Sequence, residues 1–497
     1  MKRRCFTVLL ATAVLVMALL TTTFVTTPTT WAGQVPFGTA TSPDIPVSHR
    51  DRVYTADQWS NTVTVTDPVD NRLLGVIRLG DPTPANLSPL YYGQVLTHGM
   101  GFSPDHRTLL VVSIASNSVA FIDTATNAVK HITYVGRSPH EAFFTQDGKE
   151  VWVTVRGENY VSVLDAMTYK EKTRIIVPNG PGMTIFSPDG KYGYVCSSFT
   201  PETVVISVAA HQIVGRVPQA SPFCPNIAAT PDGKQVWFTL KDTGKTEVFD
   251  ARPPFPVLKT LDTGPITNHV NIVHNAHGTF AYVTVGGLNE VQVFRTGTFS
   301  KVATIPVGAL PHGLWPSGDG TRMYVGLENG DRLVAIDTLT NQVMATSLIG
   351  QGCQAITYVP NAVPSGTGTQ GLVSLGIAEQ TTHLSLVPLV HGKPATGQQA
   401  PTSVSLFDQG LVQVLQAAVT GLEPMQSYVL ALSNNPSGNG TLEPLEAFRT
   451  NQAGAAIVNT VGPIRQVVRG EDNVPRRYLV IIPGTAQQHG TPVQVQE

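Results

Sequence analysis

Histidine residues recur at one place in a repeating pattern, and they are the side chains best suited to chemistry in this chain of 497 residues. Three of them, His98, His140 and His312, each stand seven residues before the Asp residue of a turn signal. His269 stands eight residues before its turn, so it joins the group only if that turn holds one extra residue. Because neutral imidazole binds copper and zinc and is an axial ligand of haem, the pattern is compatible with a metal or haem site.

Other polar residues are expected beside these histidines. Gln354 has the equivalent place in the last repeat, and Glu141 directly follows His140, where it could support a ligand by hydrogen bonding. Cys224 and Cys353 stand one place earlier in their repeats, and thiolates bind the same metals as imidazoles do. The metal interpretation therefore combines the four histidines with these two cysteines.

A long insertion precedes the first of these histidines. Residues 81–96, which include Tyr91 and Tyr92, lengthen the connection that leads to His98. Such a loop could cover the site and form one wall of a ligand pocket. The alternative is a purely structural role for the histidines, because a histidine that opens a strand can simply bond a loop carbonyl group.

Two independent markers define the repeat that positions these residues. One is a turn of the type found at residues 187–191, Ser-Pro-Asp-Gly-Lys, and the other is an alternating apolar strand that usually ends in Asp, as at 119–123. For either marker, successive copies are 56, 42, 42, 43, 45 and 42 residues apart. Tight turns and period-2 alternation indicate short antiparallel strands, and the repeat length fits the four strands of one β-propeller blade.

Seven copies predict a seven-bladed β-propeller over residues 49–360. The chain enters at the second strand of one blade, near Arg52, and the last inner strand, near 354–359, completes that blade, which removes the open sheet edge. Aromatic residues recur at a fixed place, and we interpret their rings as packing between blades. These residues are Tyr54, Trp152, Tyr194, Trp237, Tyr282 and Tyr324.

The repeats resemble a known family. Residues 152–155 and 282–285, together with the Ser-Pro-Asp-Gly-Lys turns, are similar to the YVTN repeat family of bacterial β-propellers. That family resembles the propellers of nitrous oxide reductase, whose hub histidines hold copper, and of the d1 domain of cytochrome cd1. The resemblance implies a seven-bladed, often exported protein but no particular reaction. This chain departs from the copper pattern at Gly182 and Pro225, which stand where further histidines would be needed.

The composition changes after the repeats. Residues 361–401 are rich in Gly, Thr, Gln and Pro and predict a linker, although 382–389 alternate like a strand of the next region. Alternating runs separated by breakers follow over 402–497 and predict a small Ig-like β-sandwich that serves as a spacer or interaction module. The chain as a whole is therefore expected to be all-β.

The first residues have the features of an export signal. Basic residues 2–4 precede the apolar run 6–20, and a small-residue cleavage site ends at Ala32. We expect residues 1–32 to be a cleaved signal peptide and 33–48 to be an N-terminal extension. The protein is then expected to be extracytoplasmic (periplasmic, secreted or at the cell surface) and to have no membrane span after cleavage.

The composition excludes several classes of protein. Charged residues make up 13% and hydrophobic residues 42%, so wholesale disorder is excluded. The net charge of −2 gives no electrostatic basis for binding nucleic acid. Cys5 would leave with the signal, so the other three of the four cysteines allow at most one internal disulfide, and the fold must depend on its own core.

Three functions stay open from the sequence. The first is a monomeric binding scaffold without a cofactor, which takes a protein or small-molecule ligand at the channel mouth. The second is a periplasmic redox or metal-handling protein that holds copper or haem with the histidines and the two cysteines. The third is a lactonase-like hydrolase, which rests on fold analogy. The ligand-binding residues in the first case are His98, His140, Glu141, His269, His312, Gln354, Tyr91 and Tyr92.

Overall fold

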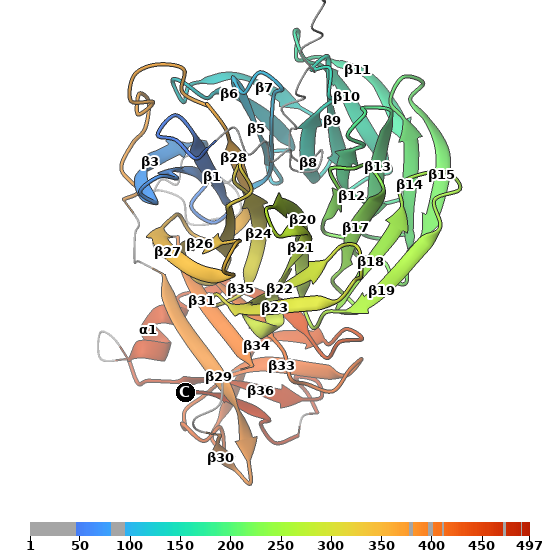
Figure 1. Cartoon of the computed structure of the whole chain (residues 1–497). Coiled ribbons are helices and arrows are strands. Elements are labelled where there is room, and N and C mark those ends of the chain that lie inside the picture. Colours follow the sequence, from blue (N-terminus) through green and yellow to red (C-terminus); the bar gives the residue numbers. More distant parts are fainter. Residues whose placement is uncertain are drawn as a thin grey trace, which may run out of the picture. The chain divides into compact units, whose positions relative to one another are not determined.

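The computed structural model describes residues 46–80, 95–376, 381–395, 401–409, 412–470, 474–488 and 490–497. These residues form seven four-stranded antiparallel sheets and one nine-stranded sheet, with helical structure limited to two short segments (Figure 1). The expected all-β, seven-bladed propeller is therefore confirmed. The predicted signal peptide, and Tyr91 and Tyr92 of the insertion, lie outside the described residues.

Each blade consists of four strands that follow one another from the innermost to the outermost. Blade 1 has β28 (Cys353–Val359), β1 (Arg52–Asp57), β2 (Thr62–Asp67) and β3 (Arg72–Arg78); blade 2 has β4 (Thr97–Phe102), β5 (Thr108–Ser113), β6 (Ser118–Asp123) and β7 (Val129–Tyr134); blade 3 has β8 (Pro139–Phe144), β9 (Glu150–Val155), β10 (Tyr160–Asp165) and β11 (Glu171–Ile176); blade 4 has β12 (Pro181–Phe186), β13 (Tyr192–Ser197), β14 (Glu202–Ser207) and β15 (Gln212–Pro218). Blade 5 has β16 (Ile227–Ala229), β17 (Gln235–Leu240), β18 (Lys245–Asp250) and β19 (Val257–Asp262); blade 6 has β20 (Thr267–Asn275), β21 (Gly278–Val285), β22 (Glu290–Arg295) and β23 (Lys301–Pro306), with the 3-10 turn η1 (Gly286–Leu288); blade 7 has β24 (Pro311–Pro316), β25 (Arg322–Leu327), β26 (Arg332–Asp337) and β27 (Gln342–Leu348).

The repeat residues have the structural roles expected of them. Each recurring aromatic ring lies on the second strand of its blade and is at most 1% exposed, as Trp152 and Tyr282 illustrate. Asp123, which closes a strand, accepts the backbone N–H groups of Ala125 and Thr126 through Oδ1 and so holds its own turn. Because both faces of each blade pack against neighbours, few strand positions can carry a charge.

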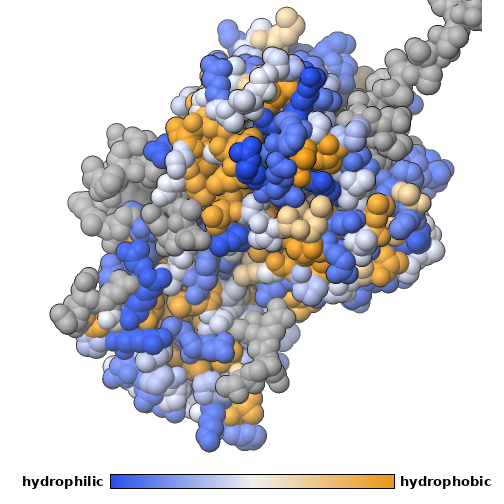
Figure 2. All heavy atoms as spheres, turned by 60° about the vertical axis from the view of Figure 1, so that its left-hand side comes forward, coloured by the Kyte–Doolittle hydropathy of each residue, from blue (hydrophilic) through white to orange (hydrophobic). Residues whose placement is uncertain are grey.

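Within the propeller, the outermost strands are more open to solvent than the inner ones. In β7 and β27 most side chains are exposed, including apolar ones such as Val129 and Val343. Figure 2 shows apolar areas interspersed with hydrophilic ones on one face of the molecule. The inner three strands of each blade supply the core.

One blade joins the two ends of the repeat region. Strand β28 pairs with β1 in an antiparallel register that runs from Arg52 opposite Val359 to Ala56 opposite Ala355. Figure 1 shows the two strands, far apart in sequence, side by side in this sheet. The closure expected from the sequence is thus present.

The C-terminal region is a single curved sheet. Its strand order is β34-β33-β36-β37-β29-β31-β32-β35, with β30 attached to β29, and the edge strands β34 and β35 approach each other, so that the sheet is nearly closed. Its elements are β29 (Thr382–Val390), β30 (Lys393–Pro394), β31 (Thr402–Asp408), β32 (Gln413–Val419), β33 (Ser427–Ser433), β34 (Leu442–Arg449), β35 (Ala456–Gly462), α1 (Ile464–Arg469), β36 (Tyr478–Pro483) and β37 (Gln494–Gln496).

The segment expected to be a linker is partly structured. Strand β29 lies inside residues 361–401 and pairs with β31 and β37, so the C-terminal module begins at Thr382, as the alternation of 382–389 allowed. Earlier in the same segment, Val373 forms an antiparallel bridge with Val76 of blade 1. The connection therefore follows the propeller surface before it enters the second sheet.

The C-terminal module packs against one face of the propeller. The ring of Trp59, in the loop between β1 and β2, stacks on Phe407 of β31 with centroids 5.9 Å apart. The Asn329 amide, between β25 and β26, donates to Ser403 Oγ at 3.2 Å. A small apolar cluster joins the two parts: it consists of Ile266, Leu310, Ala418 and Ala455, with Ile457 at its edge. Since Leu310 directly precedes β24, this is the face on which the inner strands begin.

Candidate metal site at the channel mouth

β-Bulges open the inner strands at this face. In blade 2, Thr97 pairs with Ser113 and Met100 pairs with Val111, so His98 and Gly99 together oppose a single residue of β5. The same irregularity occurs at His140–Glu141 in blade 3 and at His312–Gly313 in blade 7. A bulge re-aims the side chains of its two residues, and here it brings the three histidines to the centre of the propeller mouth.

The four imidazoles form a buried chain of contacts. Ring centroids are 4.3 Å apart for His98 and His140, 6.4 Å for His98 and His312, and 4.6 Å for His312 and His269. All four side chains are at most 5% exposed. The convergence expected from the repeat register is therefore present in the structure.

Backbone carbonyl groups fix the orientation of two of these rings. Nδ1 of His140 lies 2.8 Å from the carbonyl oxygen of Gly182, and Nδ1 of His312 lies 2.7 Å from that of Gln354. A carbonyl oxygen only accepts, so in both histidines Nδ1 carries the proton and Nε2 presents a lone pair. A hydrogen bond to a carbonyl group is expected if the histidines have a purely structural role. The bond uses only one ring nitrogen, however, and leaves the other available to a ligand.

His269 reaches the cluster from a different register. In blade 6 the bulge holds Asn268 and His269, so His269 takes the place of Glu141 and Asn268 that of His140. Asn226 accepts the N–H of Val270 through Oδ1, which leaves its Nδ2 to donate to Nδ1 of His269 at 3.2 Å. His269 therefore carries its proton on Nε2, which has no hydrogen-bond partner within the described residues.

Burial keeps the cluster uncharged. It lowers the pKa of His98 to about 3, with the charges of Arg156 and Lys241 acting in the same direction and a backbone hydrogen bond with His140 opposing them. Burial likewise lowers the pKa of His269 to about 3 and holds those of His140 and His312 well below the usual value of 6.5. Four neutral imidazoles are thus present at neutral pH, as metal ligation requires.

Glu141 adds a carboxyl group to the first two histidines. One ligand atom from each of His98, His140 and Glu141 lies within 4.8 Å of the others. Burial raises the pKa of Glu141 well above its usual value and so favours the protonated form, while a backbone hydrogen bond with Met100 opposes this effect. A bound cation would favour the charged form instead. Glu141 and His269 also line a small cavity of about 10 Å³ in the channel, roughly the room that one water molecule needs.

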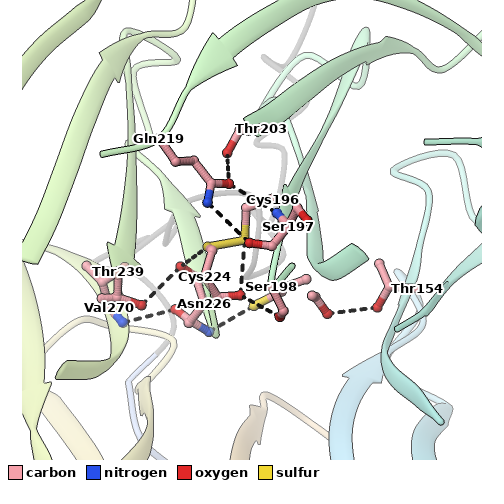
Figure 3. The surroundings of a disulfide bond; sticks show 12 residues. Thr154, Cys196, Ser197, Ser198, Thr203, Gln219, Cys224, Asn226, Thr239 and Val270 are labelled. Carbon is pink, nitrogen blue, oxygen red and sulfur yellow. Dashed lines mark hydrogen bonds between the residues drawn. A yellow bond between two sulfur atoms is a disulfide. The ribbon is translucent and has the colours of Figure 1, made fainter. Parts of the chain in front are cut away.

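The cysteines are not available as thiolates. Cys224 forms a disulfide with Cys196, which links the segment before blade 5 to strand β13 of blade 4 (Figure 3). Cys353 is free but buried, its thiol faces the carbonyl oxygen of Ala355 at 3.6 Å, and burial raises its pKa well above the usual value. The metal set expected from the sequence therefore loses Cys224 and Cys353, because neither presents a thiolate.

The disulfide does carry information about the compartment. Stable disulfides are typical of oxidising compartments.

Gln354 lies at the mouth, as the sequence predicts. Its backbone carbonyl holds His312, and its side chain is buried. Among the described residues, we find no helix long and apolar enough to cross a membrane.

Sequence reasoning missed three charged residues at the mouth. Arg156, Lys241 and Glu328 are each the first residue after the second strand of their blade. The Arg156 guanidinium lies 5.0 Å from the ring centroid of Phe223, and the Lys241 ammonium lies 5.7 Å from the same centroid. An alignment of the residue that follows the second strand in each repeat would have identified these three residues, because charged residues are rare in this chain.

Together, the fold and the site define a β-propeller with a buried histidine cluster at its channel mouth. No family model matches the chain, and no curated protein sequence matches it. The YVTN assignment therefore stays a prediction.

Solved structures provide the comparison of the fold. A functionally unknown protein from Desulfotomaculum acetoxidans aligns with a TM-score of 0.52 and 16% identity over 62% of this chain and 98% of its own. Hydrazine synthase from Kuenenia stuttgartiensis aligns with a TM-score of 0.47 and 20% identity over 52% of this chain and 88% of its own. Dihydro-heme d1 dehydrogenase NirN in complex with DHE aligns with a TM-score of 0.48 and 15% identity over 67% of this chain and 81% of its own. At such identities the first of these alignments supports the architecture alone.

Proposed function

We propose that this protein is an extracytoplasmic metal-binding propeller that holds a transition-metal ion with His98, His140 and Glu141. The observation that carries the proposal is the fixed tautomer of His140, whose Nδ1 donates to the Gly182 carbonyl so that Nε2 offers a lone pair inside a buried site. Metal-bound histidines typically have such a second partner. The compartment is supported by the disulfide.

The donor set narrows the choice of metal. Two imidazoles and one carboxylate suit zinc or copper better than magnesium or calcium, which prefer oxygen ligands alone. Haem, the other cofactor considered, fits less well, because rings with centroids 4.3 and 4.6 Å apart leave no room for a porphyrin between the members of either pair. Nδ1 of His98, which has no hydrogen-bond partner within the described residues, is a further unsatisfied donor or acceptor at the site.

Titration of the purified full chain with Zn²⁺ and Cu²⁺ by calorimetry tests this proposal. We expect stoichiometric binding that His98→Ala or His140→Ala weakens by at least 100-fold, because each substitution removes a ligand. His274→Ala, at an exposed histidine outside the mouth, is the matched control and should bind as the wild type does. Equal binding by His140→Ala and the wild type would contradict the proposal.

A second candidate is a binding scaffold for a small anion at the same mouth. Arg156 and Lys241 favour it, since both lie against Phe223 and neither forms a salt bridge within the described residues. Asp242 lies near enough for its charge to oppose the effect of burial on the pKa of both groups, so the site is not purely cationic. A rise in melting temperature with citrate that Arg156→Gln abolishes, in metal-free buffer, would support this candidate.

A further inference from the structure

Glu328 is a buried carboxylate, and one of its oxygens has no hydrogen bond to any residue that the structure describes. Its side chain is 5% exposed, and Oε1 accepts a hydrogen bond from Nε2 of Gln416 at 2.7 Å. Within the described residues Oε2 has no hydrogen bond, and it lies 3.8 Å from Nε2 of His312. Because Nδ1 of His312 donates to the Gln354 carbonyl, two electron-rich atoms face each other across this gap.

A cation between the two atoms would satisfy both of them. A separation of 3.8 Å is too long for a hydrogen bond, and an unpartnered buried carboxylate oxygen is costly. Zinc bonds to imidazole nitrogen and carboxylate oxygen are about 2.0–2.2 Å long, so one ion can span a gap of up to about 4.2 Å. Lys241 lies near enough for the charge of Glu328 to oppose the lowering of its pKa by burial, but no salt bridge joins the two in the part of the chain that the structure describes.

We infer that His312 and Glu328 bind a second metal ion beside the one held by His98, His140 and Glu141. The inference rests on the proposed function for the class of ligand, a divalent transition metal. The two positions are distinct, because the rings of His98 and His312 are 6.4 Å apart and the compact group of ligand atoms does not include His312 or Glu328. Each position has at least one imidazole and one carboxylate.

The C-terminal module positions the second site. Gln416 lies on β32, in the interior of the second sheet, and is 3% exposed. Its Nε2 also lies 3.1 Å from Oδ1 of Asn329, whose own amide donates to Ser403. These contacts hold Gln416 against Glu328, so the module contributes a positioning residue to the propeller mouth instead of acting only as a spacer.

Titration of the full chain with Co²⁺, followed by visible absorption, tests this inference. The wild type should bind two ions per chain with two distinct sets of d–d bands. Glu328→Gln keeps an acceptor for Gln416 but loses the anionic oxygen, so it should bind one ion with the bands of the first site unchanged. His140→Ala should give the complementary result, one ion with the bands of the second site.

Gln416→Ala separates positioning from ligation. Loss of a residue that holds a metal ligand typically weakens binding 10- to 100-fold, so we expect about a 10-fold weaker second site with shifted bands. Gln409→Ala is the matched control, since Gln409 Nε2 donates to the Trp59 carbonyl across the same interface, and it should leave both sites unchanged. If Glu328→Gln does not fold, Glu328→Asp should still show a weakened second site.

The outcomes distinguish this inference from the proposed function. One ion per wild-type chain, lost in His140→Ala and kept in Glu328→Gln with unchanged affinity, would overturn the inference and leave the proposed function intact. No stoichiometric Co²⁺ binding by the wild type would overturn both. Two ions in both the wild type and Glu328→Gln, with equal affinities, would also contradict the assignment of Glu328.

Discussion

Gln416 and Glu328 stand 88 residues apart in the sequence and meet at the channel mouth, where the Gln416 amide donates to Glu328 Oε1 at 2.7 Å. Gln416 belongs to the C-terminal sheet and Glu328 to blade 7, so this bond joins the two parts of the protein at the histidine cluster. The opposite oxygen of Glu328 faces His312. The metal interpretation therefore concerns the whole chain and not the propeller alone.

The stability of the metal-free protein should fall as the pH is lowered below about 6.5. Unfolded histidines bind protons near pH 6.5, whereas burial lowers the pKa of folded His98 and His269 to about 3. Between these values the unfolded state binds more protons than the folded state, so the free energy of unfolding rises with pH. The stabilising contribution of these histidines is complete only above pH 6.5. Urea unfolding from pH 4 to 8 measures this slope.

The variant His98→Gln separates the contribution of His98 to the pH dependence of stability from that of acidic groups that act in the opposite direction. Burial raises the pKa of Asp57 to about 7, and this group changes stability with pH in the opposite direction. His98→Gln removes one proton-binding group of the unfolded state, so its slope between pH 4 and 6 should be lower than that of the wild type by about 1.4 kcal/mol per pH unit. Identical slopes would show that His98 is protonated in the folded protein.

The disulfide should stabilise the propeller. Cys196 and Cys224 enclose a sequence separation of 28 residues, for which the chain-entropy model gives about 3–4 kcal/mol. We therefore expect Cys196→Ser/Cys224→Ser to unfold at a lower urea concentration than the wild type. Reductant should lower the midpoint of the wild type and leave that of the double variant unchanged, whereas an equal effect on both would assign the change to another group.

Gly99 is required beside His98 for a steric reason. A Cβ atom at this position would lie 2.2 Å from the His140 carbonyl oxygen and 2.2 Å from Glu141 Oε2. Gly99→Ala should therefore cost about 1–3 kcal/mol of stability and weaken metal binding, because the strand of blade 2 must move. Gly297→Ala is the control, since its Cβ would meet no atom within 4 Å, and thermal unfolding of both variants gives the comparison.

Trp59 should hold the C-terminal module on the propeller. Trp59→Ala removes the stacking contact with Phe407, so amides of β31 should exchange with deuterium faster while those of β9 keep their rate. The expected loss of stability is about 1–3 kcal/mol. Tyr134→Ala, at a residue 75% exposed, should change neither quantity. Unchanged exchange in β31 would mean that other contacts suffice to dock the module.

The sequence predicts the propeller well because each blade repeats the same local signals. A turn such as 187–191 and a ring such as Trp152 recur at constant spacing, so architecture follows from the period. The positions of His98, His140 and His312 follow from the same period. His269 breaks it, because it takes the second place of its bulge, where Glu141 stands in blade 3, and only the strand register reveals that it still reaches the cluster.

The repeat pattern does not predict the site of Glu328 and Gln416. Glu328 stands in a loop where a single repeat gives no reason to expect a ligand, and its partner Gln416 lies in a different sheet. Contacts between sheets depend on how their surfaces pack, which neither periodicity nor composition encodes. For the same reason the sequence left Cys224 among the metal ligands, whereas the structure pairs it with Cys196.

Anomalous diffraction from crystals of the zinc-loaded full chain is the most direct test of the metal site. We expect a strong peak at the zinc edge within about 2.0–2.2 Å of ring nitrogens of His98 and His140 and in contact with the Glu141 carboxylate. No peak at the channel mouth, with zinc found only at the group of His49, Asp67 and Asp70, would contradict this metal site.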